Sequence, residues 1–161
     1  MKALVVYYSR TGTTKKVAEA IADALKCPVE VLSDQKNRRG PVGYARCAKD
    51  ILLRRKVDLN KLKKDVSKFD LVIIGTPVWL HQPSSITRTF LQDYGRKLKK
   101  VAFFCTYMGA GEKHVFKSMA ALCGKEPVAV FPVRSFEVYT GSYAHKVNAF
   151  VDELKHTFSK K

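Results

Sequence analysis

The chain has 161 residues, of which 46% are hydrophobic and 27% charged, a composition typical of one globular domain rather than of a disordered or fibrous chain. Its 30 Lys and Arg residues exceed its 14 Asp and Glu residues, so the net charge of +16 favours acidic partners. The longest apolar run is far below the ~20 residues that cross a bilayer, and membrane insertion is therefore not expected.

The cysteines and the first residues favour a cytoplasmic protein. None of the four cysteines forms a C-x-x-C pair, and no histidine stands at zinc-finger spacing, so neither a metal site nor a disulfide framework is predicted. Residues 1–8 lack the successive regions of a signal peptide. We expect reduced thiols, with Cys105 packed in the core rather than acting as a nucleophile.

Short apolar runs alternate with segments of helical periodicity. In chain order, the pattern predicts strand 3–8, helix 14–25, strand 28–32, helix 44–56, strand 71–74, helix 85–98, strand 101–105, helix 114–122, strand 128–133 and helix 144–158. Five strands that alternate with helices indicate βαβ units. We therefore predict a single α/β domain over residues 1–161, with a doubly wound, five-stranded parallel sheet between two helical layers. Ligands of such sheets bind at the carboxyl ends of the strands.

The loop after the first strand has the composition of an anion site. Its hydroxyl residues are Ser9, Thr11, Thr13 and Thr14, with Arg10 and Gly12 among them, and a predicted helix follows. A helix N-terminus offers free N–H groups and a positive dipole end, and glycine lets a phosphate approach the backbone. A plain Ser/Thr cap is the alternative. The loop matches neither the G-x-G-x-x-G nor the G-x-x-x-x-G-K-[ST] pattern, and no cysteine begins a C-x₅-R motif.

Two segments resemble the flavodoxin family. Residues 5–18 are similar to its opening strand and its Thr/Ser-x-Thr-Gly-x-Thr phosphate loop, which Ser9, Thr11, Gly12 and Thr14 match. Residues 70–79 are similar to its third strand and to the loop that lines the flavin ring. The length and the unbroken fifth strand resemble the short-chain members. The resemblance implies FMN as a non-covalent cofactor.

The resemblance also assigns the next two loops to the flavin ring. The first contributes Thr76, Pro77, Val78, Trp79, Leu80 and His81, and the second contributes Thr106, Tyr107, Met108, Gly109 and Gly111. Trp79, the only tryptophan, offers a flat apolar face, although packing is the commoner use of tryptophan. His81 could stack on the ring, donate a hydrogen bond to it or be solvated. Many flavodoxins stack a tyrosine from the second of these loops, a role open to Tyr107.

The basic residues concentrate between the second and third strands. Residues 36–68 hold twelve basic and three acidic residues, a local net charge of +9. Familiar flavodoxins are acidic, so we expect an acidic redox partner here, such as a ferredoxin-like protein. Nucleic acid is the weaker alternative because only Tyr44 interrupts the run, and base stacking needs several aromatic side chains. A solvated basic face without a dedicated partner is the third possibility.

These observations predict an FMN-binding electron-transfer protein in which the flavin does the chemistry and no side chain is assigned as catalytic. One alternative is an FMN-dependent NAD(P)H:quinone-type oxidoreductase. A second is a basic module that binds nucleic acid or an anionic surface without a flavin. Because positive charge stabilises the reduced flavin anion, we also expect a less negative low-potential couple than in acidic relatives.

Overall fold

A parallel sheet lies at the centre of the chain, which a computed structural model describes over residues 1–159. Its five long-range strands are β1 (Ala3–Tyr7), β2 (Val29–Val31), β3 (Leu71–Trp79), β5 (Lys100–Tyr107) and β6 (Val130–Arg134). They pair in parallel in the order β2-β1-β3-β5-β6. This order confirms the predicted doubly wound α/β fold. The order reverses between β1 and β3, and sheets of this kind, flavodoxins being the standard example, bind ligands at that point.

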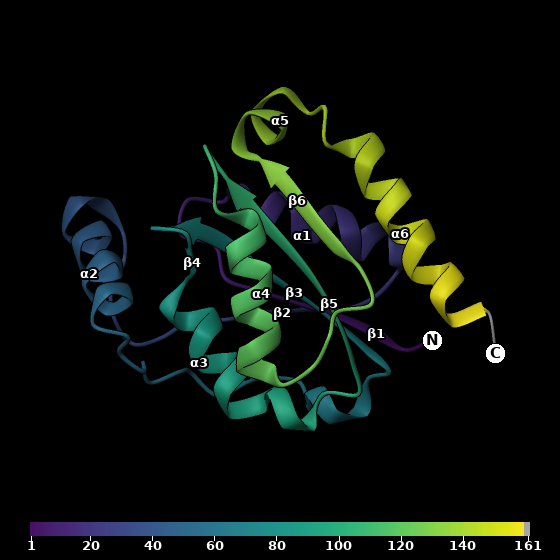
Figure 1. The fold of residues 1–161 in the computed structure, drawn as a ribbon, viewed down its shortest axis with the longest axis horizontal. Coiled ribbons are helices and arrows are strands. Elements are labelled where there is room, and N and C mark those ends of the chain that lie inside the picture. The colour runs from purple at the N-terminus through teal and green to yellow at the C-terminus, as the bar shows by residue number, and fades with distance from the viewer. Residues whose placement is uncertain (160–161) are drawn as a thin grey trace.

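Two helical layers cover the sheet (Figure 1). Helices α3 (Ser85–Tyr94) and α4 (Glu112–Cys123) lie on one face, while α1 (Thr13–Leu25) and α6 (Ala144–Ser159) lie on the other. Side chains of β1 alternate between the two cores: Leu4 and Val6 face the first pair of helices, and Val5 faces the second. Because β1, β3 and β5 are buried on both faces, their sequences are continuous apolar runs.

The third strand is longer than its apolar core suggests. The sequence predicts that it ends before Gly75, but β3 continues to Trp79 because β5 pairs with it as far as Pro77. A two-residue strand, β4 (Gln82–Pro83), then folds back antiparallel on its end. The expected loop after the third strand is therefore the end of a strand and a tight hairpin.

Part of the basic segment forms a helix, α2 (Gly40–Leu52), which begins and ends about four residues before the predicted helix 44–56. Of the twelve basic residues of the segment, Arg46 and Lys49 lie on this helix. Pro41 stands in the first turn, where a missing N–H is tolerated. The helix stops because Arg54 adopts a left-handed conformation, with a φ of 49°. In Figure 1, α2 lies at the side of the molecule, close to the end of β3.

The remaining helices are short. A helix after β6, α5 (Ser135–Thr140), and two 3₁₀ turns, Val66–Lys68 and Gly95–Lys97, were not predicted. The second 3₁₀ turn takes up the end of the predicted helix 85–98. The other helices agree with prediction to within two residues.

Candidate functional site

A cavity of about 370 Å³ opens at the carboxyl ends of β1, β3 and β5, where all three predicted loops meet. Among residues 1–159, the predicted site residues that line it are Ser9, Arg10, Thr11, Thr13, Thr14, Pro77, Val78, Trp79, Leu80, His81, Thr106, Tyr107, Met108 and Gly109. Segments almost a hundred residues apart in the chain thus build one site. Its volume falls in the range of small-molecule and cofactor pockets.

Three predicted residues lie just outside this lining. Gly12 caps α1 with a φ of 97° and borders a neighbouring hollow, so it shapes the loop rather than the cavity wall. Thr76 is buried, and its hydroxyl accepts a hydrogen bond from the Ser84 N–H and donates one to the Pro77 carbonyl. Gly111 caps α4 and lies against His81. Each of the three therefore positions a neighbouring part of the site.

The first loop presents the free end of α1. The Ser9 hydroxyl accepts a hydrogen bond from the Gly12 N–H at 3.1 Å, which turns the chain into the helix. Within the described part of the chain, no side chain caps this helix, so the N–H groups of its first turn stay available. The buried Thr14 hydroxyl lies 2.7 Å from the Thr106 hydroxyl and ties the first loop to the third. A helix N-terminus with free N–H groups is suited to binding an anion such as a phosphate.

Arg10 adds a positive charge to the same loop. Its guanidinium carbon lies 5.5 Å from the centre of the Tyr44 ring, a cation–π distance. Its Nε is buried and has no hydrogen-bond partner among the described residues. A buried donor without a partner is costly, and an anion bound in the loop would satisfy it.

The second loop provides an aromatic wall. Trp79 is half-buried and packs edge-to-face against Tyr8, with ring centres 6.0 Å apart. Burial raises the pKa of the Tyr8 phenol, so that ring stays neutral. Leu80 and His81 form the two-residue turn between β3 and β4, and both have positive φ angles, 50° and 59°. This conformation is unusual for such residues, and it turns both side chains out at the cavity mouth.

The third loop gives the cavity its opposite wall. Tyr107 is held in place by Arg134, whose Nε donates a hydrogen bond to the phenol oxygen at 3.4 Å. Met108 is 88% exposed, which makes it the most exposed large apolar side chain of those described. Cys105, below this loop, is fully buried, and burial raises the pKa of its thiol. That agrees with the predicted packing role.

Four further residues line the cavity that the sequence did not assign: Tyr44, Ala110, Ser135 and Tyr139. Ser135 and Tyr139 belong to α5, directly after β6, so the rule that ligands sit at strand ends pointed to them. Tyr44 lies on α2, and it reaches the cavity only because of the way in which that helix packs on the rest of the domain. The basic segment therefore borders the site, although it is distant from the site motifs in sequence.

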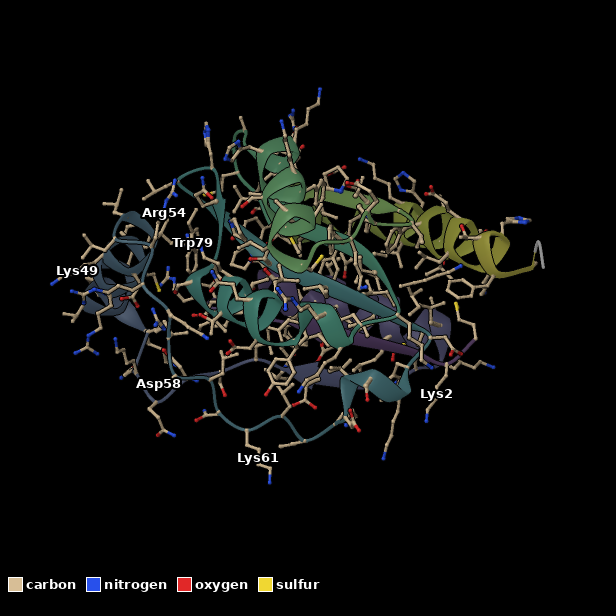
Figure 2. The ribbon with its side chains drawn as sticks, turned by 60° about the horizontal axis from the view of Figure 1, so that its bottom comes forward. Lys2, Lys49, Arg54, Asp58, Lys61 and Trp79 are labelled. Carbon is tan, nitrogen blue, oxygen red and sulfur yellow. The ribbon has the colours of Figure 1, made fainter. Side chains whose placement is uncertain are left out.

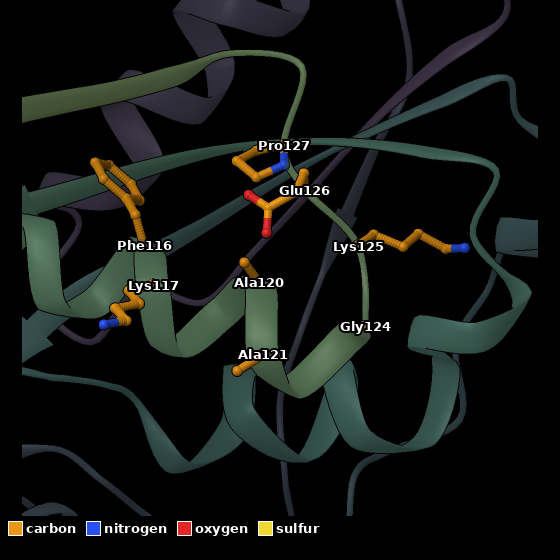
Figure 3. Close-up of a pocket in the computed structure, with 8 residues that line it drawn as sticks. All are labelled: Phe116, Lys117, Ala120, Ala121, Gly124, Lys125, Glu126 and Pro127. Atoms are coloured by element: carbon orange, nitrogen blue, oxygen red, sulfur yellow. The ribbon is translucent and has the colours of Figure 1, made fainter.

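A second hollow, of about 560 Å³, lies between the C-terminal half of α4 and the segment that leads to β6 (Figure 3). Figure 3 shows Phe116 and Pro127 on its walls, with the charged ends of Lys117 and Lys125 pointing outward. It adjoins the amino ends of the strands, which is the edge away from the binding point of doubly wound sheets. We therefore assign the functional site to the cavity at the carboxyl edge.

The model of the family described as "Flavodoxin" matches residues 2–132. The chain belongs to the flavodoxin family. This match confirms the resemblance drawn from the two segments, and it supports FMN as the cofactor. Among curated proteins, no sequence matches the chain.

Solved structures agree with the flavodoxin assignment. A flavoprotein from Lactobacillus acidophilus NCFM in complex with FMN is 26% identical, with a TM-score of 0.69 over 88% of this chain and 98% of that one. A Bacteroides uniformis protein described as a putative flavoprotein is 19% identical, with a TM-score of 0.79 over 94% and 97%. The apo form of an NADH:FMN oxidoreductase is 16% identical, with a TM-score of 0.62 over 100% and 92%. The last two likenesses show the fold alone.

The residues of this flavodoxin fit the cofactor. The uncapped end of α1 and the partnerless Arg10 Nε suit a phosphate, and the flat faces of Trp79 and Tyr107 suit an aromatic ring system. Over residues 1–159, no helix is both long and apolar enough to cross a membrane.

Proposed function

We propose that this flavodoxin binds FMN in the cavity at the carboxyl ends of β1, β3 and β5 and serves as a one-electron or two-electron carrier. The observation that carries the proposal is the convergence of an uncapped helix end, an unpaired guanidinium donor and an aromatic wall on one cavity. The flavin supplies the redox chemistry, and the protein supplies binding and electrostatics.

Different groups of the protein bind the phosphate and the ring of the cofactor. The first-turn N–H groups of α1, the hydroxyls of the first loop and Arg10 bind the phosphate. Trp79 and Tyr107 exclude water from the ring. The Tyr8 phenol, kept neutral by its raised pKa, holds Trp79 at its edge without adding a charge.

Binding can be tested with a matched pair of threonine variants. The Thr11 side chain is exposed and lines the cavity, so T11A removes a phosphate donor at little cost to folding. Thr157 on α6 hydrogen-bonds only to its own helix, so T157A is the control. Titration by quenching of FMN fluorescence should give a Kd at least tenfold weaker for T11A, since hydrogen bonds to charged groups are among the stronger ones. A colourless protein that leaves added FMN fluorescent would overturn the proposal.

The partner of the carrier is proposed to be acidic. The cavity mouth is rimmed by exposed apolar side chains, Leu80, Met108 and Tyr139, and α2 places the basic segment beside it through Tyr44. A partner with a negative surface would dock on α2 with its redox centre toward the flavin. Electron transfer from a reduced acidic ferredoxin-like protein should slow steeply as salt rises, because salt screens this attraction. A rate that is independent of salt would contradict an acidic partner.

A turnover enzyme is the second candidate, favoured by the likeness of the fold to an NADH:FMN oxidoreductase. The two functions differ in one assay. The FMN-loaded protein should consume NADH or NADPH with a quinone acceptor if it is an oxidoreductase. It should show no turnover, and yet accept electrons from a reduced protein, if it is a carrier.

A further inference from the structure

Arg88 on α3 is a buried arginine without a carboxylate. The residue is only 7% exposed, and its Nη1 is buried with no hydrogen-bond partner in residues 1–159. Over the same residues, the only arginine that forms an ion pair is Arg38. Moving a charge out of water is costly unless a counter-charge offsets it, so buried arginines are normally paired. The buried guanidinium of Arg88 therefore has hydrogen-bond donors that an anion could accept from.

The position of Arg88 directs it to the functional edge of the sheet. Helix α3 is capped by Ser84, whose N–H donates a hydrogen bond to the Thr76 hydroxyl in the second half of β3. Side chains on a helix lean toward its N-terminus, so the stem of Arg88, one turn into the helix, extends back toward this edge. The first turn of α3, which carries Arg88, therefore starts beside the end of the strand that carries Trp79.

A second guanidinium approaches from α2. The Val57 N–H donates to the Thr89 hydroxyl at 3.1 Å, which holds the segment just after Arg54 against α3 next to Arg88. In agreement with this contact, burial, and after it the positive charge of Arg54, lower the pKa of Arg88. Arg54 is exposed and held just beyond α2 by its left-handed backbone. Figure 2 shows Arg54 and Trp79 at the same end of the molecule, the end where Figure 1 shows β3 pointing toward α2. Like charges that converge in this way repel each other unless an anion lies between them.

We propose that Arg88 and Arg54 form a second anion site, beside the flavin cavity on its Trp79 side, that takes the phosphate group of a small redox substrate. The site is separate from the phosphate loop, which belongs to α1. Two guanidinium groups match the charge of about −1.5 to −2 on a phosphate monoester, and they bind its oxygens in forked pairs. A small ligand is favoured over an acidic protein because a side chain on a protein surface could not reach a group as buried as Arg88.

The first test compares thermal unfolding of FMN-loaded protein in sodium phosphate and in sodium chloride, at equal pH and ionic strength. FMN fills the phosphate loop, so any further stabilisation reports a second site. Orthophosphate should raise the Tm of the wild type and of R55M, a control that removes an exposed charge next to Arg54. The rise should vanish in R88M and shrink in R54M. An equal rise in wild type and R88M, or equal losses in R54M and R55M, would overturn the proposal.

Should R88M fail to fold, the pair R54M and R55M still decides, because both side chains are exposed. A second arm separates free phosphate from a substrate. NADPH should bind wild type at least tenfold more tightly than R88M, while NADH should bind both alike. Equal discrimination by wild type and R88M would refute the substrate assignment and leave a site for the free ion.

In calling the ligand a redox substrate, the proposal rests on the second candidate function, the FMN-dependent oxidoreductase, and not on the carrier. If the protein proves colourless, the same unfolding measurements apply to the apoprotein. Orthophosphate would then fill the phosphate loop as well, and R88M should lose part of the stabilisation that wild type shows. Failure of FMN binding and failure of the second anion site therefore give different results.

Discussion

The molecule has two buried arginines, Arg38 just before α2 and Arg88 on α3, and they differ in whether carboxylates pair with them. Arg38 donates to the Asp34 carboxylate through Nε and Nη2, to Asp50 through Nη2 at 2.8 Å, and to the Cys47 sulfur through Nη1. Its pKa is raised by these hydrogen bonds, against the effect of burial. Arg88 has no such carboxylates, and its pKa is lowered.

This difference indicates that the charge of Arg38 has a structural role, whereas the charge of Arg88 is available to bind a ligand. The Arg38 cluster joins the segment after β2 to α2, and Gly43 packs directly on the Arg38 backbone, where a Cβ would lie 2.0 Å from its carbonyl carbon. All the donor groups there are used within the protein. At Arg88 they are not, so the first arginine fixes α2 in place and the second is free to bind a ligand beside it.

The largest effect should come from removing the paired charge. In R38M, two buried carboxylates would face each other without a cation, and breaking a buried ion pair costs about 3–5 kcal/mol. The variant should then favour uptake of a proton, so its stability should recover as pH falls from 7 toward 5. Chemical denaturation across this pH range, with R39M as an exposed control, measures both effects. A loss as small as that of R39M would show that the cluster does not hold α2.

The unpaired charge should behave in the opposite way. Replacing Arg88 by Met removes an uncompensated buried charge and keeps the apolar stem, so R88M should be more stable by about 1–2 kcal/mol in phosphate-free buffer. The exposed R96M variant on the following turn is the control. Destabilisation of R88M on the scale of R38M would mean that Arg88 is a structural residue and would remove the contrast between the two arginines.

The sequence predicted the parts of this molecule that follow from local patterns. Buried strands and a Ser/Thr-Gly loop are visible in short windows, and they predicted the sheet and the edge of it at which the cavity opens. Arg88 was not visible in this way. The apolar stripe of its helix, which includes Ile86 and Phe90, places Arg88 on the opposite side, where exposure is the normal expectation. In the structure α2 packs against α3, and Arg88 is buried.

The same limit explains the other differences. Tyr44 reaches the cavity because α2 is docked by Asp34, Arg38 and Asp50, and no periodic pattern encodes that cluster. The extension of β3 to Trp79 depends on pairing with β5 and β4, which are partners distant in the chain or formed only by the hairpin. Contacts between distant segments decide these features.

A smaller change in stability is expected from removing the repulsion between Arg54 and Arg88. Arg54 is exposed, so R54M should stabilise the phosphate-free protein by only ~0.2–1 kcal/mol, the usual range for surface charge interactions. The gain should disappear in the R88M background, because the charge that Arg54 repels is then absent. A double-mutant cycle of the two substitutions measures this coupling. Additive effects would show that the two arginines do not share a site.

The smallest effect concerns Arg10 in the phosphate loop, whose Nε is buried without a hydrogen-bond partner among the described residues. A charge ~10 Å from the flavin in water contributes about 0.4 kcal/mol, or ~20 mV for one electron, and Arg10 is partly buried, so this value is a lower bound. R10Q should therefore make the low-potential couple more negative by ~20 mV or more, because the reduced flavin anion loses a stabilising charge. Redox titration at saturating FMN measures the shift. K61Q is the matched control, since Figure 2 shows Lys61 well away from Trp79. Added salt should narrow the difference between R10Q and wild type. Equal potentials in R10Q, K61Q and wild type would mean that the unpaired charges of this protein serve ligand binding alone and do not tune the flavin.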